Sequence, residues 1–220
     1  MIAAVLFDLD ETLLDRTGSL RAFLADQHAR FGAALGAADV ATWTAQFLAL
    51  DARGHRPKAE VYPEILRTFG GRPDAAGRLL ADYETNCCRH ARSFDGMADT
   101  LAALRARGLR LGIVTNGEGG FQRRHVAALG LEPRVDAVLV SAEEGLRKPD
   151  AALFRRAADR LGAAPGACLF VGDNPSADVL GASAAGMRPV WFRCGQAWPD
   201  DLPPNPGPTI DRLAEVLALV

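Results

Sequence analysis

Short runs of consecutive apolar residues alternate along most of the chain with segments of helical periodicity. The runs are four or five residues long and are rich in Val, Ile, Leu and Phe, a composition typical of strands that are buried on both faces. Strands that alternate with helices in this way predict a parallel sheet covered on both sides, that is, an α/β core of the doubly wound, Rossmann-like type. We expect these strands at residues 3–7, 110–114, 136–140, 168–171 and 189–192.

Helical periodicity fills the intervals between the later strands. A proline-rich stretch, residues 198–208, interrupts this pattern near the C-terminus and predicts a surface loop. After it, Ile210 begins another apolar pattern, for which Thr209 is a suitable N-cap. We therefore expect a last helix that begins near Ile210, in addition to helices near residues 97–107, 120–129, 151–161 and 177–185.

The segment from residue 18 to residue 92 breaks the alternation, because it has helical periodicity and no strand pattern. Turn signals rich in glycine and proline divide it into four helices. We therefore predict an α/β core formed by residues 1–17 and 93–220, with a four-helix domain of residues 18–92 inserted after the first strand. Because the insertion leaves the sheet beside a cluster of carboxylates, we interpret it as a cap domain. The alternative is that the helices only widen the fold.

Composition and charge argue against several classes of protein. The chain has 220 residues, 49% of them hydrophobic, and a formal net charge of −2, with no basic cluster of the kind that binds nucleic acid. No apolar run approaches the roughly 20 residues that span a bilayer. The four cysteines show neither metal-ligand spacing nor a disulfide pattern, and the adjacent Cys87 and Cys88 are expected to point apart. With no signal-like N-terminus, these features favour a reduced, cytoplasmic protein. A monomer and a homodimer are both compatible with the sequence.

Polar residues that can carry chemistry follow four of the predicted strands. In an open parallel sheet, ligands bind outside the carboxyl ends of the strands, so we expect these residues to share one site. Together they supply carboxylates, a hydroxyl and an ammonium, the groups needed to transfer a phosphoryl group to a carboxylate. An isolated aspartate after a strand is more often only a turn or N-cap residue, so the prediction depends on the whole set. Its members are Asp8, Asp10, Thr115, Asn116, Lys148, Asp173 and Asp178.

Lysine usage singles out Lys148. Of the 25 Lys and Arg residues, only Lys58 and Lys148 are lysines, so a generic surface cation in this chain is normally an arginine. A compact ammonium at residue 148 indicates a position that a planar, bidentate guanidinium does not fit. Lys58 lies in a basic loop of the inserted segment. That loop has two interpretations, contact with an anionic substrate or a solvated turn, and we favour the solvated turn.

The four clusters, in this order, resemble the four motifs of the haloacid dehalogenase-like (HAD) superfamily of hydrolases. The resemblance covers nearly the whole chain, since the helical insertion stands where that superfamily places its helical cap. The stretch Val-Thr-Asn-Gly at 114–117 with Gln122, and Ser-Ala-Glu at 141–143 before Lys148 and Pro149, are similar to one branch in particular. That branch contains pyrimidine nucleotidases and N-acylneuraminate-9-phosphatases.

The resemblance implies a role for each carboxylate. Asp8 would be the nucleophile that takes the phosphoryl group, and Asp10 would protonate the leaving oxygen and later deprotonate water. Mg²⁺ would be bound by Asp8, by the backbone carbonyl of Asp10 and by Asp173. Asp178 would join the metal through water or only orient its ligands.

The remaining two motifs are implied to bind the substrate's phosphate. Thr115 and the amide of Asn116 would contact phosphoryl oxygens, and Lys148 would neutralise both the transferred group and the aspartates. The predicted activity is Mg²⁺-dependent hydrolysis of a small phosphomonoester, such as a nucleotide or a sugar phosphate. Alternatives on the same core are a phosphomutase and a 2-haloacid dehalogenase, although the dehalogenase pattern has no acid at the position of Asp10. A binding protein on an inactive scaffold would be expected to lack at least one member of the set.

Overall fold

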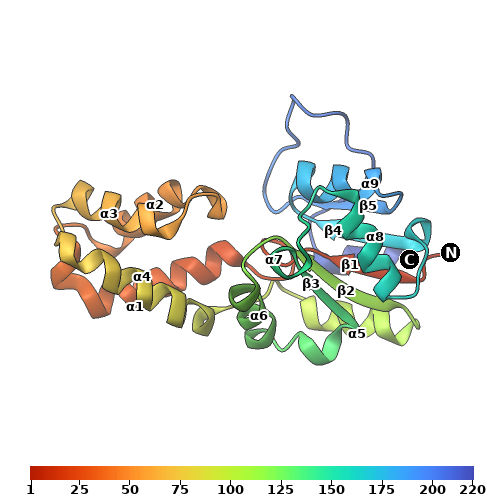
Figure 1. Cartoon of the computed structure of the whole chain (residues 1–220), viewed down its shortest axis with the longest axis horizontal. Coiled ribbons are helices and arrows are strands. Elements are labelled where there is room, and N and C mark those ends of the chain that lie inside the picture. Colours follow the sequence, from red (N-terminus) through yellow and green to blue (C-terminus); the bar gives the residue numbers. More distant parts are fainter. The chain divides into compact units, whose positions relative to one another are not determined.

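The chain folds into two units in the computed structural model, which describes all residues from Met1 to Val220 (Figure 1). One unit combines Met1–Asp15 with Ser93–Val220 and contains the sheet. The other, Arg16–Arg92, is entirely helical. No helix in either unit is both long enough and apolar enough to span a bilayer.

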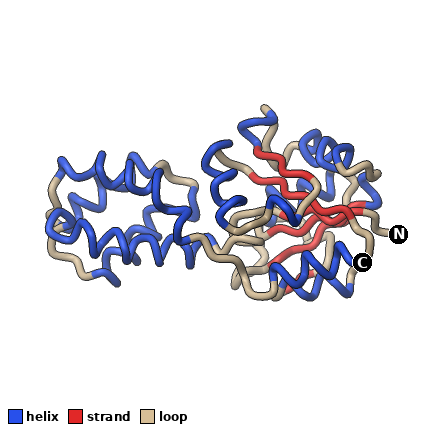
Figure 2. Tube along the Cα trace, turned by 90° about the horizontal axis from the view of Figure 1, so that it is seen from below, coloured by secondary structure: helices blue, strands red, loops and turns tan.

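A six-stranded parallel sheet forms the centre of the first unit (Figure 2). Its strand order is β3-β2-β1-β4-β5-β6, so the chain proceeds outward from β1 first in one direction and then in the other. Every neighbouring pair is parallel. The strands are β1 (Ala4–Phe7), β2 (Arg110–Thr115), β3 (Ala137–Val140), β4 (Cys168–Gly172), β5 (Arg188–Phe192) and β6 (Thr209–Ile210).

Helices cover both faces of this sheet, which confirms the predicted doubly wound fold. Ala4 and Leu6 of β1 pack in one apolar cluster with side chains of the helices α8 and α9. Val5 and Phe7 are also fully buried, and because alternate residues of a strand face opposite sides, they pack against the other layer. The helices of this unit are α5 (Met97–Ala106), α6 (Gly119–Ala128), α7 (Ser141–Glu144), α8 (Ala151–Arg160) and α9 (Gly181–Ala184), the last of which follows a π-helical turn, η6 (Pro175–Leu180).

The C-terminal segment differs from the prediction. The helix expected to begin near Ile210, with Thr209 as its N-cap, is wrong, because Thr209–Ile210 instead pair with Trp191 and Phe192 as the edge strand β6. Burial of Ile210 beside β5 explains the difference, since tertiary contact outweighs the local helical pattern. A 3₁₀ helix follows only at Leu213–Ala218.

The second unit contains four α-helices, as the sequence predicts. They are α1 (Arg16–Leu35), α2 (Val40–Asp51), α3 (Lys58–Phe69) and α4 (Ala76–Asn86), joined or followed by the 3₁₀ turns η1 (Ala52–Gly54), η2 (Pro73–Ala75) and η3 (Cys87–His90). Aromatic side chains fill the centre of the unit. Trp43, Phe47 and Tyr62 are fully buried, and the rings of Phe47 and Tyr62 meet edge to face, 5.2 Å apart.

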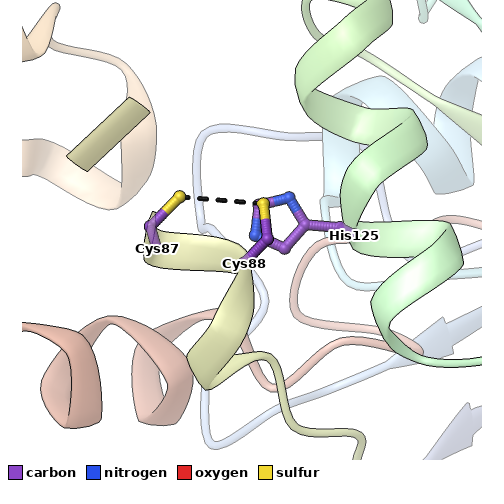
Figure 3. Close-up of side chains that lie close together, drawn as sticks. All are labelled: Cys87, Cys88 and His125. Atoms are coloured by element: carbon purple, nitrogen blue, oxygen red, sulfur yellow. Dashed lines mark hydrogen bonds between the residues drawn. The ribbon is translucent and has the colours of Figure 1, made fainter. Parts of the chain in front are cut away.

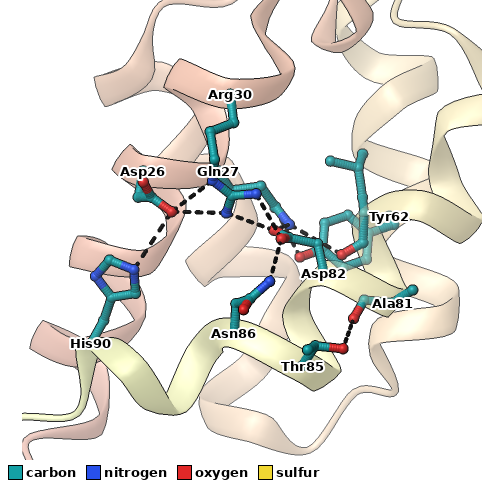
Figure 4. Close-up of polar contacts among 10 residues, drawn as sticks. Asp26, Gln27, Arg30, Tyr62, Ala81, Asp82, Thr85, Asn86 and His90 are labelled. Atoms are coloured by element: carbon teal, nitrogen blue, oxygen red, sulfur yellow. Dashed lines mark hydrogen bonds and ion pairs between the residues drawn. The ribbon is translucent and has the colours of Figure 1, made fainter.

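A buried glutamine connects three of these helices through hydrogen bonds (Figure 4). The side-chain amide of Gln27, on α1, donates to the carbonyl oxygen of Leu79 (3.1 Å) and to Asp82 Oδ2 (2.9 Å), both on α4. Its oxygen accepts from the hydroxyl of Tyr62 on α3 (2.9 Å). Arg30 also pairs with Asp82, with two hydrogen bonds of 2.6 and 2.8 Å. Because every buried polar group of Gln27 is paired, the network specifies how α1, α3 and α4 pack.

The adjacent cysteines differ from their expected arrangement. Cys87 and Cys88 point toward each other, with their Sγ atoms 3.8 Å apart, because they occupy the turn η3 at the end of α4 instead of the middle of an α-helix (Figure 3). Both are buried. Figure 3 also draws His125, which belongs to α6 of the sheet-containing unit.

Candidate functional site

The candidate site lies at the carboxyl ends of the central strands, where the strand order reverses. Asp8 directly follows β1 and Asp173 directly follows β4, the two neighbouring strands whose connections lead to opposite edges of the sheet. Phe7 pairs with Val171, and the backbone N–H of Asp8 donates to the carbonyl oxygen of Val171 (2.9 Å), so the two strand ends are level. This reversal is the usual position of a ligand site in such a fold.

Lys148 is the buried cation of the site. Its Nζ lies 2.5 Å from Asp8 Oδ1 and 2.6 Å from Asp178 Oδ1, and all three side chains are almost entirely buried. Burial alone lowers the pKa of Lys148, but the charges of Asp178 and Asp8 outweigh it and raise the pKa above its ordinary value. The ammonium therefore stays protonated at neutral pH and serves as a charge and a hydrogen-bond donor.

Asn116 fixes the backbone that carries Lys148. The side-chain oxygen of Asn116 accepts from the backbone N–H of Lys148 (2.9 Å), and its side-chain nitrogen donates to the carbonyl oxygen of the same residue (3.0 Å). This two-point contact connects the end of β2 to the loop before α8. Because the side-chain amide is engaged in this way, any contact of Asn116 with a phosphoryl oxygen falls to its backbone N–H.

Three buried carboxylates form a possible metal site. One oxygen atom from each of Asp8, Asp173 and Asp178 lies within 4.8 Å of the other two. Burial raises the pKa of Asp8 well above its ordinary value, Lys148 lowers it, and the nearby carboxylates of Asp178, Asp173 and Asp10 raise it further. When all are ionised, three carboxylates face one ammonium and leave an excess of two negative charges in a buried place. A hard divalent cation such as Mg²⁺, which prefers oxygen ligands, fits this donor set and this charge.

Asp10 lies apart from this group and contacts a glutamine. Gln122, near the start of α6, donates from Nε2 to Thr115 Oγ1 (2.7 Å) and to Asp10 Oδ2 (3.2 Å). Thr115 and Gln122 are buried, whereas Asp10 is partly exposed. The side chain of Gln122 passes over Gly117, where a Cβ atom would lie 2.7 Å from its Cγ, so only glycine fits at residue 117. One amide therefore sets the positions of a hydroxyl at the end of β2 and a carboxylate in the loop after β1.

Asp173 is bound at both its backbone and its side chain. Its carbonyl oxygen accepts from Trp191 Nε1 (2.9 Å), and its Oδ2 accepts from Gln196 Nε2 (3.3 Å). Gly172, just before it, allows Asp178 to approach the end of β4, because a Cβ atom at residue 172 would lie 2.5 Å from the Asp178 side chain. Asp178 Oδ2 in turn accepts from the backbone N–H of Asn174 (3.0 Å).

The structure thus brings the predicted residues to one edge of the sheet. Asp8, Lys148 and Asp178 are in direct contact, and Asp173 is in the same carboxylate group. Three contact residues were not predicted. In the sequence, Gln122 stands out only as a feature of one family branch, and nothing distinguishes Trp191 or Gln196. The available signal for Gln122 was its position on the first turn of the helix after β2.

The whole chain is similar to known hydrolases. Residues 2–186 match the family model described as haloacid dehalogenase-like hydrolase. The chain is 38% identical over 159 residues to the phosphoserine phosphatase of Thermus thermophilus, a match that covers 72% of this chain and 63% of that protein. It is 30% identical over 235 residues to the glyceraldehyde 3-phosphate phosphatase of Methanopyrus kandleri, covering 100% of this chain and 97% of that protein. The N-acylneuraminate-9-phosphatase of Mus musculus is 30% identical over 162 residues, covering 71% of this chain and 64% of that protein.

Solved structures have the same fold over the whole chain. The 2-haloacid dehalogenase of Pseudomonas syringae superimposes with a TM-score of 0.63 at 30% identity, covering 100% of this chain and 98% of that one. The HAD-hydrolase YfnB of Bacillus subtilis superimposes with a TM-score of 0.75 at 23% identity, covering 99% and 98% of the two chains. The resemblance inferred from the four motifs is confirmed, and an N-acylneuraminate-9-phosphatase, a member of the branch that these motifs resemble, is among the relatives. The chain belongs to the haloacid dehalogenase-like hydrolases.

Proposed function

We propose that this hydrolase is a Mg²⁺-dependent phosphatase that removes phosphate from a small phosphomonoester through an aspartyl-phosphate on Asp8. The observation that carries the proposal is the contact of Lys148 with both Asp8 and Asp178, inside a group of buried carboxylates at the switch point of the sheet. A carboxylate that is buried beside a permanent cation has the charge and the restricted orientation that a nucleophile requires.

Two displacements complete the proposed reaction. A carboxylate oxygen of Asp8 forms a bond to phosphorus while the bond from phosphorus to the substrate's oxygen breaks, and Asp10 gives its proton to that leaving oxygen. Water then attacks phosphorus and loses a proton to Asp10, and the bond between Asp8 and phosphorus breaks, releasing inorganic phosphate. Gln122 keeps Asp10 beside Thr115, so the proton donor and the phosphate-binding hydroxyl act on the same group.

The phosphate-binding groups are proposed to be Thr115, the backbone N–H of Asn116, and Lys148. The metal ligands are proposed to be Asp8, the backbone carbonyl of Asp10, and Asp173, with Asp178 held mainly by Lys148 and by the backbone at Asn174. Bound there, Mg²⁺ would supply positive charge that offsets the buried carboxylates and the negative charge of the phosphoryl group.

The proposed substrates are small. The relatives described above are named for phosphoserine, glyceraldehyde 3-phosphate and N-acylneuraminate 9-phosphate, all of them small phosphomonoesters. We interpret the helical unit Arg16–Arg92 as a cap that excludes bulk water during the reaction, which disfavours macromolecular phosphates. Sugar phosphates and nucleotides belong in the first substrate panel beside these three compounds.

Dehalogenation is the second candidate, because a 2-haloacid dehalogenase matches the chain over its full length. In that reaction the aspartate attacks carbon and a halide leaves without a proton. The carboxylate of Asp10, held by Gln122 in a defined position, has no task there, whereas an alkoxide leaving group needs a proton. This favours the phosphatase.

The deciding experiment compares hydrolysis of p-nitrophenyl phosphate by purified protein with Mg²⁺ and with EDTA, beside the variant Asp8→Asn. We expect turnover that requires both Mg²⁺ and Asp8. A parallel assay measures halide release from a 2-haloacid. Phosphatase activity that survives in Asp8→Asn would overturn the mechanism, and halide release without phosphate release would establish the second candidate.

A further inference from the structure

A turn after β5 contacts the candidate site at two points. In this 193–196 turn, the backbone N–H of Gln196 donates to the carbonyl oxygen of Arg193 (2.9 Å). Gln196 Nε2 lies 3.3 Å from Asp173 Oδ2, and the thiol of Cys194 lies 3.7 Å from Glu11 Oε2, next to Asp10 in the loop after β1. The turn therefore contacts both the loop after β1 and the residue that follows β4, although it belongs to neither.

The backbone of this turn is in an unusual conformation. Cys194 has φ of 46° and Gly195 has φ of 73°, so two consecutive residues adopt the left-handed region. Glu11 is left-handed as well, with φ of 58°. A residue with a β-carbon adopts this region only where surrounding contacts stabilise it, and such residues gather at functional sites. The two left-handed residues other than glycine in the sheet-containing unit, Glu11 and Cys194, are the two that contact each other.

The turn restrains the orientation of the Asp173 side chain. Trp191 Nε1 donates to the backbone carbonyl oxygen of this residue (2.9 Å) and fixes its backbone. The side-chain amide of Gln196 donates to Oδ2 of Asp173 and so restrains the orientation of a carboxylate that lies in one group with those of Asp8 and Asp178. Hydrogen bonds to the ligands of a metal orient those ligands and change the affinity for the ion.

We propose that Gln196, two residues after the left-handed Cys194, is a positioning residue that orients the Asp173 carboxylate for a divalent cation. The inference rests on the proposed function, because it takes Asp173 as a metal ligand. It requires that loss of the Gln196 amide weaken cation binding while the fold is unchanged.

The test measures Mn²⁺ binding to the full chain by electron paramagnetic resonance, in which free Mn²⁺ gives the signal, without substrate. Gln196→Met keeps the length of the side chain and removes the donor. Asn205→Ala is the matched control, because Asn205 lies in the same loop, is also half-buried, and bonds only within that region, to Thr209 and Gly207. We expect the Mn²⁺ dissociation constant to rise about tenfold in Gln196→Met and to stay within about twofold in Asn205→Ala, with the same thermal midpoint for all without metal.

The outcomes separate this inference from the proposed function. Wild-type affinity in Gln196→Met, together with loss of binding in Asp173→Asn, would overturn the positioning role and leave the metal site intact. Equal weakening in Gln196→Met and Asn205→Ala would also overturn it, since the loop as a whole would then be responsible. Binding that survives in Asp173→Asn would instead refute the metal site of the proposed function.

Discussion

Replacing Lys148 with methionine removes a buried charge and leaves its two partners in place. Methionine has nearly the same length and no charge, so the apolar stem of the side chain keeps its packing. Asp8 and Asp178 then lose the ammonium that lies 2.5 and 2.6 Å from them, in a site where both are almost fully buried. Removing one partner of a buried ion pair costs about 3–5 kcal/mol, because the remaining charge stays desolvated. We expect the free energy of unfolding to fall by about this amount at pH 8.

The loss should depend on pH in a definite direction. Burial and the surrounding carboxylates already raise the pKa of Asp8 in the folded state, and without Lys148 nothing opposes them. A carboxyl whose pKa is higher in the folded than in the unfolded state binds its proton preferentially when folded. Stability therefore falls as pH rises from the unfolded pKa to the folded one. Lowering the pH from 8 to 5.5 should recover part of the stability that Lys148→Met has lost.

The matched control is Lys58→Met, which removes the chain's only other lysine. Lys58 pairs with Asp51, which is equally buried, but Asp51 also accepts two hydrogen bonds from Arg16 (2.9 and 3.1 Å) and one from the backbone N–H of Gly54 (2.8 Å). Its carboxylate stays paired with Arg16, so we expect a clearly smaller loss than in Lys148→Met, where the ammonium is removed from two buried carboxylates.

Urea denaturation in EDTA, followed by circular dichroism and tryptophan fluorescence, measures both variants. For Lys148→Met, a Trp43→Phe background leaves Trp191 and Trp198 of the sheet-containing unit as reporters, whereas Lys58→Met, in the helical unit, keeps Trp43. A loss below about 1 kcal/mol in Lys148→Met, or one that is the same at pH 5.5 and pH 8, would refute the claim that this lysine offsets buried carboxylates.

Three further changes test other contacts. Gly172→Ala places a Cβ atom 2.5 Å from the Asp178 side chain, so we expect the free energy of unfolding, measured by thermal unfolding, to fall by about 1–3 kcal/mol. A thermal midpoint equal to that of the wild type would contradict this close contact. Gln122→Leu removes the donor that the Thr115 hydroxyl and the Asp10 carboxylate share. The kcat for p-nitrophenyl phosphate should fall about 10- to 100-fold while the circular dichroism spectrum is unchanged. An unchanged kcat would show that the donor has no part in turnover. In Asp51, burial raises the pKa but the hydrogen bonds from Arg16 outweigh it, so the pKa is lowered. The stability that this carboxylate gives the helical unit is therefore present above the ordinary carboxyl pKa and is lost as the pH falls through the lowered pKa. Urea midpoints measured from pH 7 to pH 3 should fall less in Asp51→Asn than in the wild type.

The parallel core could be predicted because its strands are short, apolar and buried on both faces. Val5, Ile113 and Phe170 are fully buried, so the runs that contain them have no polar interruption and stand out against the helical segments. The edge strand β6 could not be predicted in this way. It has only two residues, too few for any periodicity, and it exists because Ile210 pairs with Phe192 across the sheet edge. Local sequence contains no information on that pairing, so the pattern there favoured a helix.

The same distinction applies to the site. Asp8, Lys148 and Asp173 could be predicted to meet because each follows a strand, and parallel strands carry such residues to one edge whatever the loops do. Gln122 and Gln196 act instead through single side-chain amides that reach in from a helix and from a left-handed turn. Neither the amide nor the turn has a pattern that differs from an ordinary polar surface. The residues proposed to perform the chemistry can therefore be predicted from strand ends, whereas those proposed to orient them become visible only when the distances between donors and acceptors are known.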